Sequence, residues 1–188
     1  LVNASLDTIE NNLTNLSNNF ISSNASKSIY QDYRFISTSF NHEQMKLVVM
    51  LSMDGINWDV IKKEGSFTPN TGNKTLRDPS LVKVSDWWYI TYTRIDWKTG
   101  NNIGFCRTKD FIEYEELNDL TFGTYNKIWA PEFFKDYKTN NTYVIFNASD
   151  DGITFHSYIQ QVWFNDNIVE KRGTHIQLQG NELSLMKN

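Results

Sequence analysis

The sequence predicts a mainly β protein that begins with one α-helix. From Tyr30 onward, short runs of β-branched and aromatic residues alternate with polar residues, and turn residues such as Asp-Gly and Gly-Asn separate the runs. Before Tyr30 the apolar residues recur every three or four positions instead, as they do along one side of a helix. Aromatic residues make up 14% of the chain, a content that suits strands joined by polar turns.

Residues 1–21 are predicted to form a coiled-coil stem. Their apolar residues follow one another in alternate steps of four and three and form a single seam: Val2, Leu6, Ile9, Leu13, Leu16 and Phe20. Almost every other position is Asn, Ser, Thr or Asp, so the helix is expected to associate through this seam. Leu6 and Ile9 at neighbouring a and d positions favour a trimer or tetramer over a dimer. The alternative is an amphipathic helix lying on its own domain, which usually has a wider apolar face.

A polar linker is expected at 22–29 and a β domain at 30–188. The first expected strands are 34–40, 46–52, 56–61, 80–84, 87–93, 103–107 and 112–116. A further unit is expected to begin at 127–132 and to continue through 142–147, 154–163 and 168–171. Trp87 and Trp88 point to opposite faces of their strand, so one is expected to be buried and the other to lie at a surface or subunit contact.

A turn of the form Ser/Thr-x-Asp recurs along the β domain, at 52–54, 108–110 and 149–151. Asp54 and Asp110 are predicted to accept backbone N–H bonds within their turns. The units are about 50 residues apart, which fits the four-stranded blades of a propeller, with a β-sandwich as the alternative. Three blades do not close a ring, since propellers usually have about four to eight. We therefore expect the chain to continue past Asn188 or the ring to be completed by other means.

Charge and composition argue against several classes of protein. The net charge of −4 makes nucleic acid an unexpected partner, and we find neither a membrane span nor a signal peptide. The single cysteine, Cys106, excludes an intrachain disulfide and is expected to be a core residue. The three histidines lack metal-ligand spacing, so no cofactor is expected, although a cation on a propeller axis stays open. Because the first residue is Leu and not Met, the chain is expected to be a piece of a longer product.

Five short motifs occur in a fixed order: Ser52–Trp58, Arg77–Ser80, Trp88–Thr93, Thr108–Phe111 and Trp129–Glu132. As a set they resemble the five-bladed propeller of the glycoside hydrolases that include arabinanases, arabinofuranosidases and xylosidases. The resemblance covers about three blades of the five, roughly residues 35–150, and implies a partial five-bladed β-propeller behind the helix.

The resemblance implies that Asp78 occupies the position of a general base. Arg77 beside it would keep the carboxylate ionised, and Pro79 would fix the backbone. Inversion at a sugar carbon needs a second carboxyl group, and after Lys171 the chain offers only Glu182, without the family's later motifs. We therefore expect a protein that binds without hydrolysing, and an inverting hydrolase with Asp78 as base if it is an enzyme. A purely structural role, with Asp78 and Arg77 tying strand ends together, is the alternative.

The Trp-Ala-Pro-Glu motif supplies two further candidate ligand-binding residues. In the family this motif lies near the sugar-facing surface, so Trp129 would stack on a sugar ring and Glu132 would lie beside it. The alternative is that Trp129 packs into the core of a blade while Glu132 bonds to a neighbouring strand. With Asp78 and Arg77, these residues make up the predicted ligand site.

A heptad stem in front of such a propeller resembles the receptor-binding proteins of tailed phages that infect Gram-positive, staphylococcal-type bacteria. This resemblance implies a homotrimer at the tail tip or baseplate of a virion, in contact with other tail proteins, that attaches to a host cell-wall polysaccharide or teichoic acid. Two alternatives stay open. One is a secreted or cytoplasmic bacterial glycoside hydrolase, and the other is a structural platform within the baseplate.

Overall fold

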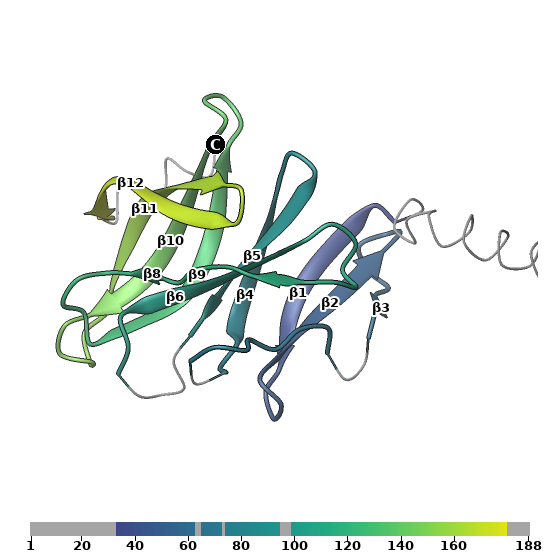
Figure 1. The fold of residues 1–188 in the computed structure, drawn as a ribbon, viewed down its shortest axis with the longest axis horizontal. Helices are drawn as coiled ribbons and strands as arrows, with labels where there is room; N and C mark the ends of the chain where they lie inside the picture. Colours follow the sequence, from purple (N-terminus) through teal and green to yellow (C-terminus); the bar gives the residue numbers. More distant parts are fainter. Residues whose placement is uncertain (1–32, 63–64, 73, 95–98, 180–188) are drawn as a thin grey trace, which may run out of the picture.

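A computed structural model describes residues 33–62, 65–72, 74–94 and 99–179, and these form a mainly β structure, as predicted (Figure 1). Within these ranges there is no α-helix, and hence none that could cross a membrane. The predicted stem at 1–21, its apolar seam and the whole predicted linker at 22–29 lie outside the described residues.

The strands form three antiparallel sheets. Sheet 1 has the order β1-β2-β3, with β1 at Phe35–Asn41, β2 at Lys46–Ser52 and β3 at Asp59–Val60. Sheet 2 contains β4 (Arg77–Val84), β5 (Trp87–Thr93), β6 (Asn102–Thr108) and β7 (Glu115–Glu116), and β8 (Leu120–Thr121) also pairs with β6. Sheet 3 has the order β12-β11-β10-β9, with β9 at Lys127–Asp136, β10 at Asn141–Ser149, β11 at His156–Asn165 and β12 at Ile168–Gln177.

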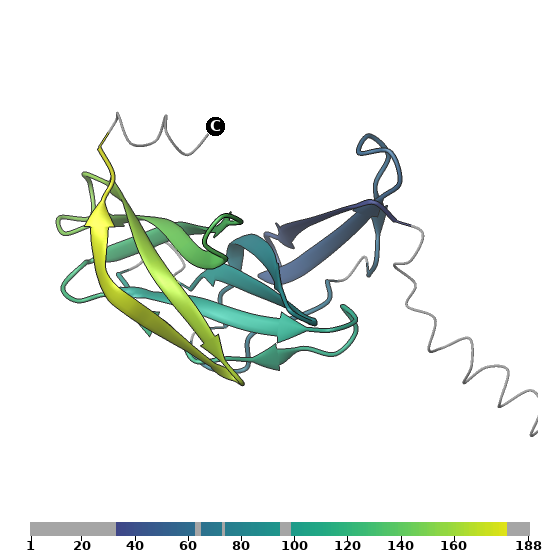
Figure 2. The same cartoon turned by 90° about the horizontal axis from the view of Figure 1, so that it is seen from above.

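Sheet 2 lies between the other two sheets and is buried on both faces (Figure 2). Alternate residues of β5 enter different cores: Tyr89 packs in the core shared with sheet 3, and Ile90 packs in the core shared with sheet 1. Cys106 is fully buried in the second of these cores, which confirms its predicted place. Trp87 and Trp88 also point to opposite cores, but both are half-buried, so the expectation of one buried and one surface ring was wrong.

Two predicted strands are much shorter than expected. The segments 56–61 and 112–116 pair only at β3 and β7, because the Asp turns before them use the backbone N–H groups that would otherwise join a sheet. At the other end of the chain, β12 extends to Gln177, well past the expected end. The short β8 was not expected at all.

The first strands of sheets 2 and 3 share a bulge at an X-Pro pair. Arg77 pairs with Thr93 and Ser80 pairs with Thr91, so Asp78 and Pro79 together oppose a single residue of β5. In β9, Ala130 and Pro131 stand in the same relation to β10. Proline has no N–H to give to a sheet, and a bulge removes the need for one. The residues before the two prolines both have positive φ, 46° at Asp78 and 49° at Ala130. The two strands are therefore built on one local plan.

The three Ser/Thr-x-Asp turns have the same internal bonds. Asp54, Asp110 and Asp151 each accept the backbone N–H groups two and three positions further on, at 2.7–2.9 Å. The Ser or Thr hydroxyl of each turn bonds the same carboxylate and accepts a further N–H. The predicted turn roles of Asp54 and Asp110 are thus confirmed.

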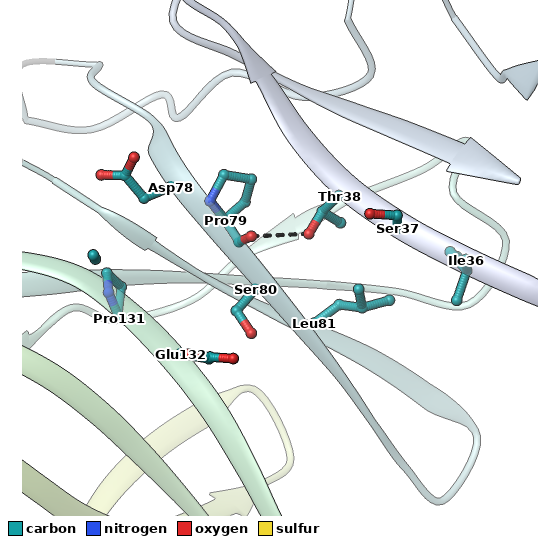
Figure 3. A pocket seen from close by; sticks show the side chains of 10 residues that line it. Ile36, Ser37, Thr38, Asp78, Pro79, Ser80, Leu81, Pro131 and Glu132 are labelled. Atoms are coloured by element: carbon teal, nitrogen blue, oxygen red, sulfur yellow. Dashed lines mark hydrogen bonds between the residues drawn. The ribbon is translucent and has the colours of Figure 1, made fainter. Parts of the chain in front are cut away.

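These turns do not occupy matching places in the sheets. The turn follows the third strand of sheet 2 but only the second strand of sheets 1 and 3. In sheets 1 and 2 it leads to a two-residue strand in the same register, with Leu51 opposite Asp59 and Arg107 opposite Glu115. Sheet 1 therefore matches β5, β6 and β7, and its described part has no counterpart of β4 or β9. The direction of β1 agrees with this match. Thr38 lies beside Pro79 and Ile36 lies beside Leu81, so β1 runs antiparallel to β4, as β5 does (Figure 3).

A buried arginine fixes the loop that leads into β4. Arg94 is 3% exposed, and its guanidinium bonds Glu116 at 2.9 Å and Asp119 at 3.1 Å. Glu116 also accepts the N–H of Asn70 at 2.7 Å and the hydroxyl of Thr71 at 2.6 Å. Removing one partner would leave a buried charge without a counter-charge. The cluster therefore holds the loop against sheet 2.

The Asp turns make stability depend on pH. The N–H groups two and three positions further on hold the pKa of Asp54 and Asp151 well below its usual range. A lowered folded-state pKa stabilises the fold above the unfolded value of about 3.9, and this stabilisation is lost as pH falls toward the folded-state pKa.

Asp54→Asn lacks this titration, so its midpoint of urea unfolding should change less than that of the wild type between about pH 5 and about pH 2.5.

Asp86→Asn is the matched control, because Asp86 is an exposed residue of the β4–β5 hairpin. This variant should follow the wild type on acidification. Equal acid sensitivity of the wild type and Asp54→Asn would contradict the role given to the turn.

Candidate functional site

A cavity of about 380 Å³ lies between β1, β4 and β9 (Figure 3). Its wall contains both bulged X-Pro pairs and the residues that follow them. The lining residues are Ile36, Ser37, Thr38, Asp78, Pro79, Ser80, Leu81, Ala130, Pro131 and Glu132. The cavity therefore gathers residues from strands that are far apart in the sequence.

Asp78 is held at the cavity by its own backbone and by a relay of hydrogen bonds. The hydroxyl of Thr93, on the neighbouring strand β5, donates to Asp78 Oδ2 at 3.0 Å. The same hydroxyl oxygen accepts the N–H of Ala130 at 2.9 Å. Thr93 is buried while Asp78 is exposed, so the relay fixes one carboxylate oxygen and leaves the group open to the cavity.

Two further bonds hold the cavity wall together. The hydroxyl of Thr38 donates to the carbonyl oxygen of Pro79 at 2.9 Å, which ties β1 to β4. The N–H of Phe133 donates to Ser80 Oγ at 3.0 Å, which ties β9 to β4. Because every lining strand is bonded to β4, the cavity is preorganised, and binding would cost little ordering of the wall.

The structure brings two of the four predicted ligand residues together. Asp78 and Glu132 both line the cavity, from β4 and β9, and both are exposed. Both belong to the predicted ligand site, although the second carboxyl group needed for hydrolysis was expected only after Lys171. The cavity thus holds two carboxylates, which can accept hydrogen bonds from hydroxyl groups or exchange protons with a ligand.

The other two predicted residues lie outside the lining of this cavity. The Arg77 guanidinium lies over the ring of Phe40, 5.5 Å from its centroid. Trp129 stacks on Phe155 with ring centroids 4.7 Å apart and an angle of 20° between the planes, and Lys127 Nζ lies 5.4 Å from the Trp129 ring. One face of this indole is therefore already covered by an aromatic ring. A role for either residue in ligand binding stays a prediction.

Thr93 is the functional residue that sequence reasoning missed. Its role depends on the register between β4 and β5 and on the approach of β9, neither of which the local sequence contains. The only available signal was that a Thr ends the strand that pairs with the Arg-Asp-Pro-Ser turn. For metals, no group of three or more His, Cys, Asp or Glu side chains in the described ranges is arranged to hold an ion.

The fold is similar to that of family-43 glycoside hydrolases. A thermostable family-43 glycoside hydrolase superposes with a TM-score of 0.55 at 12% identity, over 71% of this chain and 49% of its own. An α-L-arabinanase from Cellvibrio cellulosa, in complex with arabinohexaose, gives 0.54 at 15% identity, over 77% of this chain and 48% of its own. An α-L-arabinofuranosidase from Clostridium thermocellum gives 0.52 at 16% identity, over 72% and 45%.

These solved structures are five-bladed propellers, and the present chain spans about half of their length. At such identities the similarity concerns the fold, and it supports the propeller over the sandwich. No family model and no curated protein matches the sequence.

The Thr93 relay can be tested by Thr93→Val, which keeps the shape but removes the hydroxyl. The N–H of Ala130 and a carboxylate oxygen of Asp78 then lose a partner, so the free energy of unfolding should fall by about 1–3 kcal/mol. Urea unfolding measures this loss. Thr121→Val, at an exposed position of β8, is the matched control and should stay within about 0.5 kcal/mol of the wild type. Equal stabilities of the two variants would contradict the relay.

Proposed function

We propose that the protein binds a carbohydrate in the cavity between β1, β4 and β9 and does not hydrolyse it. The observation that carries this proposal is the pair of exposed carboxylates, Asp78 and Glu132, on the wall of one cavity in a glycoside hydrolase-like fold. Carboxylate oxygens accept hydrogen bonds from sugar hydroxyls, while Pro79, Leu81 and Pro131 offer apolar surface to the carbon atoms of a ring.

The two bulges place their acidic residues at different positions, which favours binding without hydrolysis. The two X-Pro bulges are equivalent, yet the position held by Asp78 in β4 is held by Ala130 in β9. Glu132 lies two residues later, where β4 has Ser80. Each bulged strand thus supplies a single acid, at a different height in the cavity. Binding needs only that both carboxylates reach the ligand, whereas catalysis needs a fixed separation of about 6.5–9.5 Å for inversion.

At a finer level, we propose that this binding serves attachment of a tailed phage to a cell-wall glycopolymer of a Gram-positive host. The support is the apolar seam of residues 1–21 in front of the propeller sequence. A trimer would present three cavities to a repetitive polymer, so individually weak contacts would add up through avidity.

A glycoside hydrolase is the second candidate, and the presence of both Asp78 and Glu132 on the wall of one cavity favours it. Asp78 would act as the base that activates water, with Glu132 as the acid that protonates the leaving group. The Thr93 hydroxyl would keep Asp78 oriented in this role.

One experiment separates binding from hydrolysis. Arabino- and xylo-oligosaccharides are titrated into the protein, and reducing ends are measured after prolonged incubation. We expect weak binding, a loss of affinity of about five- to tenfold in Asp78→Asn and in Glu132→Gln, and no release of reducing ends.

Asp59→Asn, which removes an exposed carboxylate in sheet 1, is the matched control and should bind like the wild type. Release of reducing ends that is lost in Asp78→Asn would replace the binding proposal with the hydrolase. Undiminished affinity in both cavity variants would place the sugar elsewhere.

The stem predicts the oligomeric state. The intact chain is expected to sediment as a trimer, and a variant without residues 1–21 is expected to sediment as a monomer, because the seam would be the contact between subunits. Sedimentation equilibrium measures both masses. A monomeric intact chain would remove the basis for attachment by avidity.

A further inference from the structure

A second groove lies at the opposite end of β4 and β9 from Asp78. It consists of a hollow of about 420 Å³ and a neighbouring one of about 240 Å³, which share Lys135 as a common wall. The β4–β5 and β9–β10 hairpins flank this end and project from the same side of the molecule (Figure 1). The two hollows together are long enough for more than a single small ligand.

The side chains of this groove differ in charge from those of the first cavity. None of its lining residues is acidic, and two are lysines, Lys83 and Lys135. The first cavity has the opposite character, with two carboxylates and no cationic side chain. The two ends of the inner strands therefore favour ligands of different charge.

Both lysines are held in place. Lys135 Nζ donates to the carbonyl oxygen of Asn140 at 2.8 Å and to the Thr142 hydroxyl at 3.3 Å. An ammonium group has three donors, and these bonds use two of them. Lys83 Nζ lies over the ring of Trp88, 5.3 Å from its centroid. Lys135 is thus half-buried and hydrogen-bonded in the groove, while Lys83 is exposed and lies against an aromatic ring.

Aromatic rings line the same groove on both sides of Lys135. Trp88, Phe134 and Tyr137 line the larger hollow, and Trp163 lines the smaller one. Tyr137 is 88% exposed and Trp163 is 46% exposed, which is unusual for rings of this size. An exposed ring beside a lysine offers an apolar face and a cation to one ligand.

We propose that this groove binds an anionic saccharide, with sugar rings against the aromatic side chains and phosphate or carboxylate groups against Lys83 and Lys135. A neutral sugar would leave the lysines without a counter-charge, and a simple anion would not use the aromatic faces. Two lysines on the walls of neighbouring hollows fit a ligand that carries more than one negative charge. The larger hollow adjoins the Asp78 cavity, with which it shares Ile36 and Leu81, but neither lysine lines that cavity.

The test uses pairs of ligands that differ only in charge. Tetragalacturonate and its methyl ester form the carboxylate pair, and glucose 6-phosphate and glucose form the phosphate pair. Each is titrated into the full chain, with the indole N–H signals of the tryptophans followed by NMR. We expect the acidic member of at least one pair to bind more tightly and to shift the Trp88 and Trp163 signals, with the advantage falling as salt is raised. The ligand pair with the larger difference in affinity shows whether the groove prefers a carboxylate or a phosphate.

The variants locate the site. Lys83→Gln should weaken binding of the acidic ligand by about two- to fivefold, and Tyr137→Ala should weaken both members of a pair. Lys62→Gln, at an exposed position beyond β3, removes the same charge and should leave the affinity unchanged.

Three results would overturn the proposal: equal affinity for charged and neutral members of both pairs, equal loss in Lys83→Gln and Lys62→Gln, or no binding of any acidic ligand. A loss of affinity in Asp78→Asn alone would assign the ligand to the first cavity instead.

Discussion

Two prolines determine the geometry on which the candidate site depends. Pro79 and Pro131 cannot donate to a sheet, so β4 and β9 each form a bulge at the point where they meet. The bulges force the preceding residues to positive φ and turn the strands, which opens the cavity between them. Thr93 then fills the space between the two bulges and bonds to both. The backbone arrangement fixes where residue 78 lies, but it does not require an acidic side chain there.

Much of the fold was predictable because its signals are local. Alternating residues placed β2 and β5 to the residue, and the bonds of each Asp turn lie within six consecutive residues. The arrangement of strands within sheets was not predictable from these turns, since one turn can follow either the second or the third strand. The meeting of Asp78 with Glu132 in one cavity could be expected only through the family resemblance. It depends on how two strands about fifty residues apart pack together, and the sequence carries no local mark of that distance.

The two ends of β4 and β9 illustrate how one pair of strands can serve different chemistry. At their beginnings the bulges carry exposed acidic side chains, whereas the hairpins at their ends place lysines and aromatic rings around the second groove. A substitution at one end needs no compensating substitution at the other, because the residues between the two ends, such as Val82, are buried in the core. Surface residues at each end can therefore vary without disturbing the packing of the sheets.

The burial of sheet 2 on both faces has a consequence for how the protein folds. A sheet with two apolar faces leaves one of them in contact with water until both neighbouring sheets have packed on it, so the complete packing of sheet 2 needs sheets 1 and 3 together. The pairs that hold them, such as β4 with β9, join residues far apart in the chain, and such contacts form slowly. During synthesis the face of β5 that packs on sheet 3 would stay exposed until β9 and β10 emerged, because sheet 3 follows β5 in the chain. That interval is when the chain is most exposed to aggregation.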